Sequence, residues 1–377
     1  MKRFLCALLL VLTFSFLNAQ EASVTTEKEW EAMIKECEEL TAKKRHHEAI
    51  EIGKKATKIA AEEYGKENWR VGRSIYVMSK TYERLGSADP AKKEIAASGF
   101  EKALAIFNKA AESGDSEAQC NLGVMYADGD GVAQDDEAAV KWYRKAADQG
   151  HALAQFVLGL MYNSGVGVTR DGEETEKWIR KAADQGYADA QAHLGFMYAI
   201  SDGGDTEAVK WYRKAAEQGH AGAQGTLGRM YAIGEGVAKD KAMAVKWYRK
   251  AAEQGLALAQ LNLGLSLTRG EGIARADEEG FKWIRKAADQ GDPEGQVALG
   301  MMYMGGRGIA KDEVEAVKWC RKAADQGYAQ AQYLLGQAYA DGMGVTKDNA
   351  EAVKWYRKAA DQGYARAKEI LKKLESE

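Results

Sequence analysis

The sequence predicts an all-α protein in which pairs of helices stack into a solenoid. The first observation is a tryptophan that recurs at intervals of 36, 36, 33, 36, 36 and 36 residues. The second is a set of glycines with the same period, and the third is a helical spacing of apolar residues on both sides of a short loop. Repeats of this length indicate stacked supersecondary units. The tryptophans are Trp142, Trp178, Trp211, Trp247, Trp283, Trp319 and Trp355.

The N-terminus has the pattern of a secretory signal peptide. Lys2 and Arg3 precede an apolar stretch over residues 4–14, and cleavage is expected after Ala19. The stretch is short for a membrane span, so an uncleaved anchor is the alternative. We therefore expect a signal peptide over residues 1–19, a mature chain without a membrane span, and a secreted or periplasmic protein.

Residues 20–116 are expected to form a distinct helical region. Apolar residues at helical spacing, among them Val71, Ile75 and Met78, carry this prediction. This pattern resembles the longer tetratricopeptide repeats of the kinesin light chain type. The predicted helices are roughly 26–43, 46–63, 68–85 and 91–112.

The first repeat unit, residues 117–150, predicts a helix, a short loop and a second helix. Ala118, Leu122 and Tyr126 are four residues apart and share one face of the first helix. Asp135 is the expected N-cap of the second helix, and Gly150 is the glycine expected just after its end. We predict seven such units over residues 117–366, followed by a charged capping helix over 367–377.

A glycine lies inside the first helix of every unit, as Gly123 does in the first. Glycine in a helix costs about 1 kcal/mol relative to alanine. A cost that recurs in every unit suggests that a neighbouring backbone approaches each glycine closely.

The repeated pattern A-x-x-x-L-G-x-x-Y-x-x-G-x-G-V, followed by D-x-x-x-A-x-x-W-Y-x-K-A-A-x-x-G, resembles the Sel1-like repeat, a relative of the tetratricopeptide repeat. The resemblance covers residues 117–370. It implies a right-handed α/α superhelix and a role as an adaptor or scaffold for protein complexes, often in secretory or envelope compartments. Cysteine-rich relatives, which are associated with binding or hydrolysing β-lactam compounds, carry a cysteine pair in each repeat. This chain lacks such pairs, because Cys37, Cys120 and Cys320 are far apart.

Positions that vary between the units are candidates for partner binding. If Ala118 and its equivalents are position 0, positions 2 and 6 point away from the core side of the first helix. Many are large and apolar, which predicts a groove for a peptide or helix. The alternative is that they pack against the adjacent repeat. The candidate groove residues are Val124, Phe156, Leu160, His193, Phe196, Arg229, Leu261, Leu265, Val297, Met301, Tyr333 and Gln337.

The sequence lacks the features that are typical of several other functions. The net charge of −3 and the mixed charges of the second helices argue against nucleic acid binding. His151 and His220 each follow a closing glycine and are interpreted as surface fillers. The Gly-x-Gly segments join helix to helix, unlike the dinucleotide-binding loop, and the calcium-like sequence at Asp128–Gly131 lacks carboxylates in its sister repeats. We expect no catalytic residues, no metal and no cofactor.

The sequence therefore predicts a non-catalytic secreted or periplasmic scaffold that binds a protein or peptide partner in the groove of its solenoid. The alternatives are a binder of peptidoglycan or another carbohydrate and a hydrolase related to the cell wall.

Overall fold

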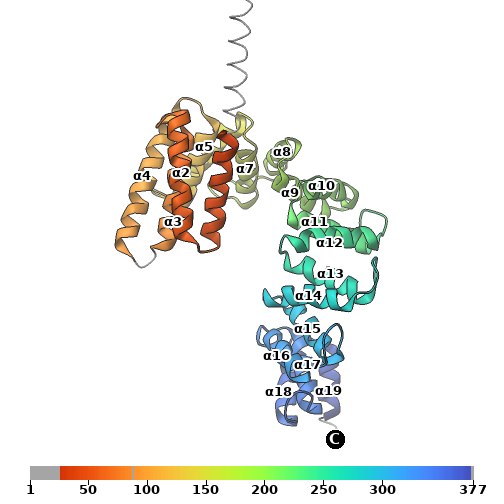
Figure 1. The fold of residues 1–377 in the computed structure, drawn as a ribbon. Coiled ribbons are helices and arrows are strands. Elements are labelled where there is room, and N and C mark those ends of the chain that lie inside the picture. Colours follow the sequence, from red (N-terminus) through yellow and green to blue (C-terminus); the bar gives the residue numbers. More distant parts are fainter. Residues whose placement is uncertain (1–25, 87–88, 375–377) are drawn as a thin grey trace, which may run out of the picture. The chain divides into compact units, whose positions relative to one another are not determined.

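The computed structural model describes residues 26–86 and 89–374 (Figure 1). These residues form helices joined by short loops, without a β-strand among them. They fall into two compact units, divided between Gln185 and Gly186, and each unit is described by itself. Within each unit, helices that follow one another in the chain pack together, which confirms the predicted solenoid of helix pairs. The expected signal peptide lies outside the described residues.

The first unit contains the N-terminal helices and the first two repeats. Its four N-terminal helices agree with the predicted bounds to within two residues. The helices of this unit are 26–42, α2 (His46–Tyr64), α3 (Trp69–Leu85), α4 (Pro90–Glu112), α5 (Ser116–Asp128), α6 (Asp136–Asp148), α7 (Ala152–Ser164) and α8 (Gly172–Asp184).

The second unit contains the other five repeats and a last helix, α19 (Ala365–Leu374). Ala367 is fully buried, and Ile370 and Leu371 pack against the cluster of Tyr333 and Tyr356. Thus α19 covers the apolar edge of the last repeat, as predicted for a cap. The repeat helices are α9 (Ala188–Ala199), α10 (Asp205–Glu217), α11 (Ala221–Ile233), α12 (Lys241–Glu253), α13 (Ala257–Arg269), α14 (Asp277–Asp289), α15 (Pro293–Gly305), α16 (Glu313–Asp325), α17 (Ala329–Asp341) and α18 (Asn349–Asp361). Among the described residues, no helix combines the length and the apolar character needed to cross a membrane.

The predicted helix boundaries are confirmed by their capping geometry. The Asp135 carboxylate accepts a hydrogen bond of 2.9 Å from the backbone N–H of Ala138. Gly150 has a φ of 90°, a conformation that L side chains rarely adopt. The equivalent aspartates cap their helices in the same way, and they are Asp171, Asp240, Asp312 and Asp348.

The interpretation of His151 and His220 as surface fillers is wrong. Each is the N-cap of a first helix, where the imidazole Nδ1 accepts a hydrogen bond from a backbone N–H. The distances are 3.2 Å to the N–H of Ala154 and 3.0 Å to that of Ala223. The position after the closing glycine is therefore the N-cap, and where its side chain is an acceptor, as in His151 and His220, it satisfies an amide at the start of the helix.

The repeat tryptophans lie on the second helices and are mostly buried, as expected. Trp142 and Trp283 are half-buried, and the other five are buried. Three residues after each tryptophan comes a lysine, whose ammonium lies over the indole ring at 3.6–4.4 Å from its centre. This cation–π contact covers the ring on its solvent side while the charge stays in water.

The glycine inside each first helix is required chiefly by a side chain. A Cβ on Gly228 would lie 2.7 Å from the Tyr248 ring and 3.3 Å from the backbone oxygen of Ala244. Tyr248 follows the repeat tryptophan, and its ring crosses the glycine of the same unit. The backbone approach that the sequence suggested is present, but the closest atoms belong to the tyrosine.

One buried and one exposed glutamine per repeat form a hydrogen-bond ladder that the sequence analysis missed. In the fifth unit, Gln260 is buried, donates to the carbonyl of Ala252 at 3.1 Å and accepts from Gln290 at 2.8 Å. Ala252 lies in the preceding second helix, and Gln290 ends the second helix of the same repeat. One amide thus links three helices, and a satisfied buried amide specifies how they pack.

In six of the seven repeats, the two glycines of the Gly-x-Gly loop have separate roles. Gly270 ends α13 in the left-handed conformation, whereas Gly272, with a φ of 72°, lies against the previous repeat. A Cβ on Gly272 would lie only 2.2 Å from the carbonyl oxygen of Lys241, the first residue of α12. The Gly-x-Gly segment is therefore a packing element between repeats.

In four repeats, an arginine of the second helix donates to the tyrosine hydroxyl 18 residues later, in the next repeat. Arg213 donates to the Tyr231 hydroxyl at 2.6 Å, and Arg285 donates to Tyr303 at 3.2 Å. In the fifth unit Leu267 takes the place of the tyrosine and is fully buried. Arg249 pairs there with Glu279 at 2.8 Å instead, so the link between neighbouring repeats is kept by a different acceptor.

Candidate functional site

The predicted groove residues separate into two groups, because positions 2 and 6 have different surroundings. Position 2 faces the N-cap of the next repeat, 31 residues later. The rings of Tyr333 and Tyr364 lie 5.2 Å apart, and Val297 belongs to the apolar cluster against which Tyr328 packs. Leu261, Val297 and Tyr333 are all buried, at 8% exposure or less. Their prediction as groove residues is therefore wrong, and the alternative of packing between repeats holds for them.

Position 6 is more open to solvent. We call the residues at this position the position-6 row; they are Val124, Leu160, Phe196, Arg229, Leu265, Met301 and Gln337. Phe196 and Met301 are large apolar residues with 51% and 55% of their surface exposed. Arg229 is exposed and forms an ion pair with Glu235 at 2.7 Å. The remaining members are half-buried, so this row is what stays available to a partner.

Two further predicted residues, Phe156 and His193, are half-buried. The imidazole of His193 lies 6.2 Å from the ring of Phe196, and burial lowers the pKa of His193. The imidazole is therefore neutral at pH 7, and it extends the apolar surface around Phe196 instead of adding a positive charge.

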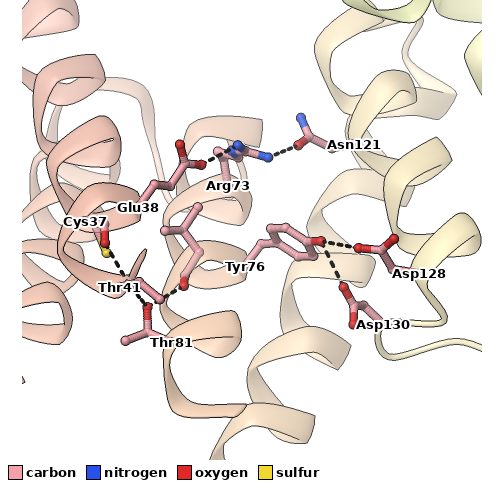
Figure 2. Close-up of polar contacts among 10 residues, drawn as sticks. Cys37, Glu38, Thr41, Arg73, Tyr76, Thr81, Asn121, Asp128 and Asp130 are labelled. Atoms are coloured by element: carbon pink, nitrogen blue, oxygen red, sulfur yellow. Dashed lines mark hydrogen bonds and ion pairs between the residues drawn. The ribbon is translucent and has the colours of Figure 1, made fainter. Parts of the chain in front are cut away.

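In the first unit, a cavity of about 310 Å³ lies among the helix 26–42, α3, α5 and α7. Its wall combines aromatic and aliphatic side chains with charged ones, among them Arg73, Glu38 and Glu117. The Arg73 guanidinium donates to Glu38 at 2.6 Å and to the Asn121 amide oxygen at 3.2 Å (Figure 2). Val124 of the position-6 row lines the same cavity, so first helices of successive pairs do share one surface in this unit.

In the calcium-like segment of the first repeat, the aspartate side chains are paired with a lysine and a tyrosine of α3. Tyr76 donates to the buried Asp130 at 2.9 Å (Figure 2), and the Lys80 ammonium lies 2.6 Å from the same carboxylate and 3.3 Å from Asp128. Burial and the neighbouring carboxylate raise the pKa of Tyr76, so its hydroxyl keeps its proton. The two aspartates therefore join α3 to the loop after α5.

In the second unit, a cavity of about 310 Å³ lies among α15, α16 and α17. Its wall is almost entirely apolar, and Met301 and Gln337 of the position-6 row belong to it. Burial raises the pKa of the Cys320 thiol to about 11, so this side chain is a neutral, apolar part of the wall. We call this cavity the methionine pocket; it is lined by Met301, Met304, Val317, Cys320, Leu334, Gln337, Ala338 and Met343, together with Gly300 and Gly305.

Sequence reasoning found the position-6 residues of both cavities and missed the rest. The position of Arg73 in the cavity wall could not be predicted, because a single arginine in a helix resembles any surface arginine. Cys320 carried a signal, since it stands where sister repeats have Tyr or Ile, but its burial alone did not point to a cavity. Within the described residues, no group of three His, Cys, Asp or Glu side chains is placed to hold a metal ion.

Comparison with protein families gives one match, to the model described as the Sel1 repeat. It includes a partial segment, 99–115, in the second half of α4, which the sequence analysis had placed in the N-terminal region. The matched segments are 99–115, 116–151, 152–187, 188–220, 222–256, 257–292, 293–328 and 329–364.

Two solved structures are similar over most of the chain. A Sel1 repeat protein from Oxalobacter formigenes is 33% identical, covers 85% of this chain and 89% of its own, and has a TM-score of 0.57. The protein c5321, a protective antigen present in uropathogenic Escherichia coli strains, is 31% identical, covers 91% of this chain and 80% of its own, and has a TM-score of 0.57. No curated protein matches the chain.

Proposed function

Because the chain belongs to the Sel1 repeat family, we propose that it is a non-catalytic scaffold that holds a peptide or helix of a protein partner against the position-6 residues within each of its two units. Repeats of this family are generally protein-interaction modules, and no enzymatic family is indicated for the chain. The observation that carries the proposal is the exposure of Phe196 and Met301 at equivalent positions of first helices. Large apolar side chains left in water at repeated positions are typical of an interaction surface.

The chemistry of the row favours a polypeptide over a glycan. Its members are mainly aliphatic and thioether side chains, which adapt to the apolar face of a helix or an extended peptide. Arg229 adds a charge that fixes orientation more than affinity. A carbohydrate site would instead present exposed aromatic rings, and Phe196 is the only ring in the row.

We expect the double substitution Leu160→Ala and Phe196→Ala to weaken partner binding at least tenfold, which corresponds to about 1.4 kcal/mol. Both changes remove apolar contact area and leave the core untouched. The measurement is the polypeptide retained by the immobilised full chain from a cell-envelope extract, quantified by mass spectrometry.

The matched control is Ile95→Ala with Ile233→Ala, two exposed apolar residues outside the row, one in each unit. This variant should retain the polypeptide as the unchanged chain does. Equal loss in both variants, or loss of helical circular dichroism in the test variant, would contradict the proposal. If the chain sediments with purified peptidoglycan and the immobilised chain retains no polypeptide, the carbohydrate alternative is favoured.

We also propose that the protein is secreted or periplasmic. Support comes from Lys2, Arg3 and the apolar residues 4–14, which fit a signal peptide. The expected result is that the mature protein, recovered from the periplasmic or extracellular fraction, begins at Gln20 when its N-terminal peptide is sequenced. An intact N-terminus in the cytosolic fraction would rule out export, whereas an intact N-terminus in the membrane fraction would indicate a retained anchor.

A further inference from the structure

The methionine pocket exists in the sixth repeat because of a substitution in its second helix. The residue after the repeat tryptophan is tyrosine or isoleucine in the other units and cysteine in this one, at Cys320. The Cys320 sulfur would lie 2.8 Å from a Cβ on Gly300, and the Tyr248 ring would lie 2.7 Å from a Cβ on Gly228. Cysteine therefore fills the space directly over the glycine but supplies none of the ring atoms beyond it.

The wall of the pocket decides what it can hold. Gln337 is its one polar side chain, and the others are aliphatic, thioether or thiol groups. At about 310 Å³ the pocket is at the small end of the range for ligand sites. It is large enough for one large apolar side chain. Charged groups are disfavoured there, because the wall offers no ion partner.

The pocket is continuous with the position-6 row, because Met301 and Gln337 belong to both. Met301 is more than half exposed, so its flexible side chain lies at the boundary between the pocket and solvent. Gln337 supplies an amide that can pair with a peptide backbone at the same boundary. A peptide lying on the row would thus pass directly over the pocket.

We propose that the methionine pocket binds one leucine or phenylalanine side chain of the partner peptide and so anchors it on the second unit. The inference rests on the proposed scaffold function and adds the class of residue that the partner must carry. A buried apolar anchor contributes much of the affinity of a peptide interface, whereas the surrounding contacts exclude water. The sixth repeat is then the specificity-determining unit of the array.

The test uses the full chain with ¹³C-labelled methionine methyl groups. N-acetyl-leucinamide and N-acetyl-phenylalaninamide are titrated, and N-acetyl-aspartamide is the negative probe. We expect saturable methyl shifts at Met301, Met304 and Met343. The buried Met230, in the apolar cluster of α11 and α12, should not shift.

Cys320→Tyr restores the residue type of the sister repeats and should fill the pocket. We expect at least a tenfold loss of affinity for both apolar probes, with the helical circular dichroism unchanged. Met343→Lys is the second variant, since it places a charge on the wall from a loop and does not depend on the packing of a helix. Its matched control is Val166→Lys, at the same loop position of the second repeat, which should keep the affinity.

The proposal is overturned if the pocket methyls do not shift, if Met230 shifts with them, or if folded Cys320→Tyr binds the probes as the unchanged chain does. These outcomes are distinct from failure of the scaffold function, because the Leu160→Ala and Phe196→Ala variant changes no residue of the pocket. If that variant loses the partner while the apolar probes cause no methyl shifts in the unchanged chain, the pocket proposal fails and the scaffold function stands.

Discussion

Replacing Gly272 by alanine is expected to destabilise the second unit by about 2–5 kcal/mol. Two costs combine at this position. An alanine with a φ of 72° is strained by about 1–2 kcal/mol. Its Cβ would also lie 2.2 Å from the Lys241 carbonyl oxygen and 2.3 Å from the carbonyl carbon. Overpacking of this kind adds about 1–3 kcal/mol, because backbone atoms must move.

Gly203→Ala separates the two costs. Gly203 has a φ of 73°, but a Cβ there would meet no atom within 4 Å. We expect this control to lose only the strain component, about 1–2 kcal/mol. Urea denaturation followed by circular dichroism measures both variants, and hydrogen exchange locates the weakened interface at α12–α14. Equal destabilisation of the two variants would show that the loop does not pack as described.

Replacing Gln260 by methionine is expected to destabilise the same unit by about 1–3 kcal/mol. Methionine has nearly the same shape, so the loss reflects the two hydrogen bonds and not a cavity. The carbonyl of Ala252 loses its side-chain donor but still accepts from the backbone N–H of Gly255 at 3.0 Å. The cost is therefore that of the two lost hydrogen bonds, about 0.5–1.5 kcal/mol each. Gln290 loses one of its two acceptors; it still donates to the carbonyl of Gly255 at 3.0 Å, and it is exposed to water.

The control for this substitution is Gln134→Met, because Gln134 lies exposed in a loop. Its expected effect is within about 0.5 kcal/mol. The free energy of unfolding of both variants is measured by urea titration and compared. If the two methionine variants were equally stable, the glutamine ladder would not contribute to stability.

Much of the fold was predictable, because period and capping are local properties. The aspartates and glycines at the helix ends, such as Asp135 and Gly150, were assigned from residue type and spacing alone. The N-terminal helices were predicted to within two residues for the same reason. These assignments depend on backbone chemistry that each helix end must satisfy wherever the helix packs.

The contacts between helices were not predictable in the same way. Position 2 and position 6 differ by only 40° around the first helix, so the pattern could not separate buried Val297 from exposed Met301. Their difference depends on the N-cap residue of the next repeat, 31 residues away. The glutamine ladder had a visible signal, since Gln260 and Gln290 recur in every unit, but glutamine is usually a surface residue and its recurrence was passed over.

The spacing of the glutamine ladder bears on how such a chain can change its length. In the third repeat the loop is three residues shorter, and Gln218 still donates to Gln191 at 2.7 Å across 27 residues instead of 30. The ladder therefore tolerates deletions in the loop between its two amides. Each glutamine pair contacts only its own repeat and the preceding one. Duplication or loss of a whole repeat during evolution would therefore leave every remaining glutamine pair intact. The number of repeats is therefore free to vary by recombination.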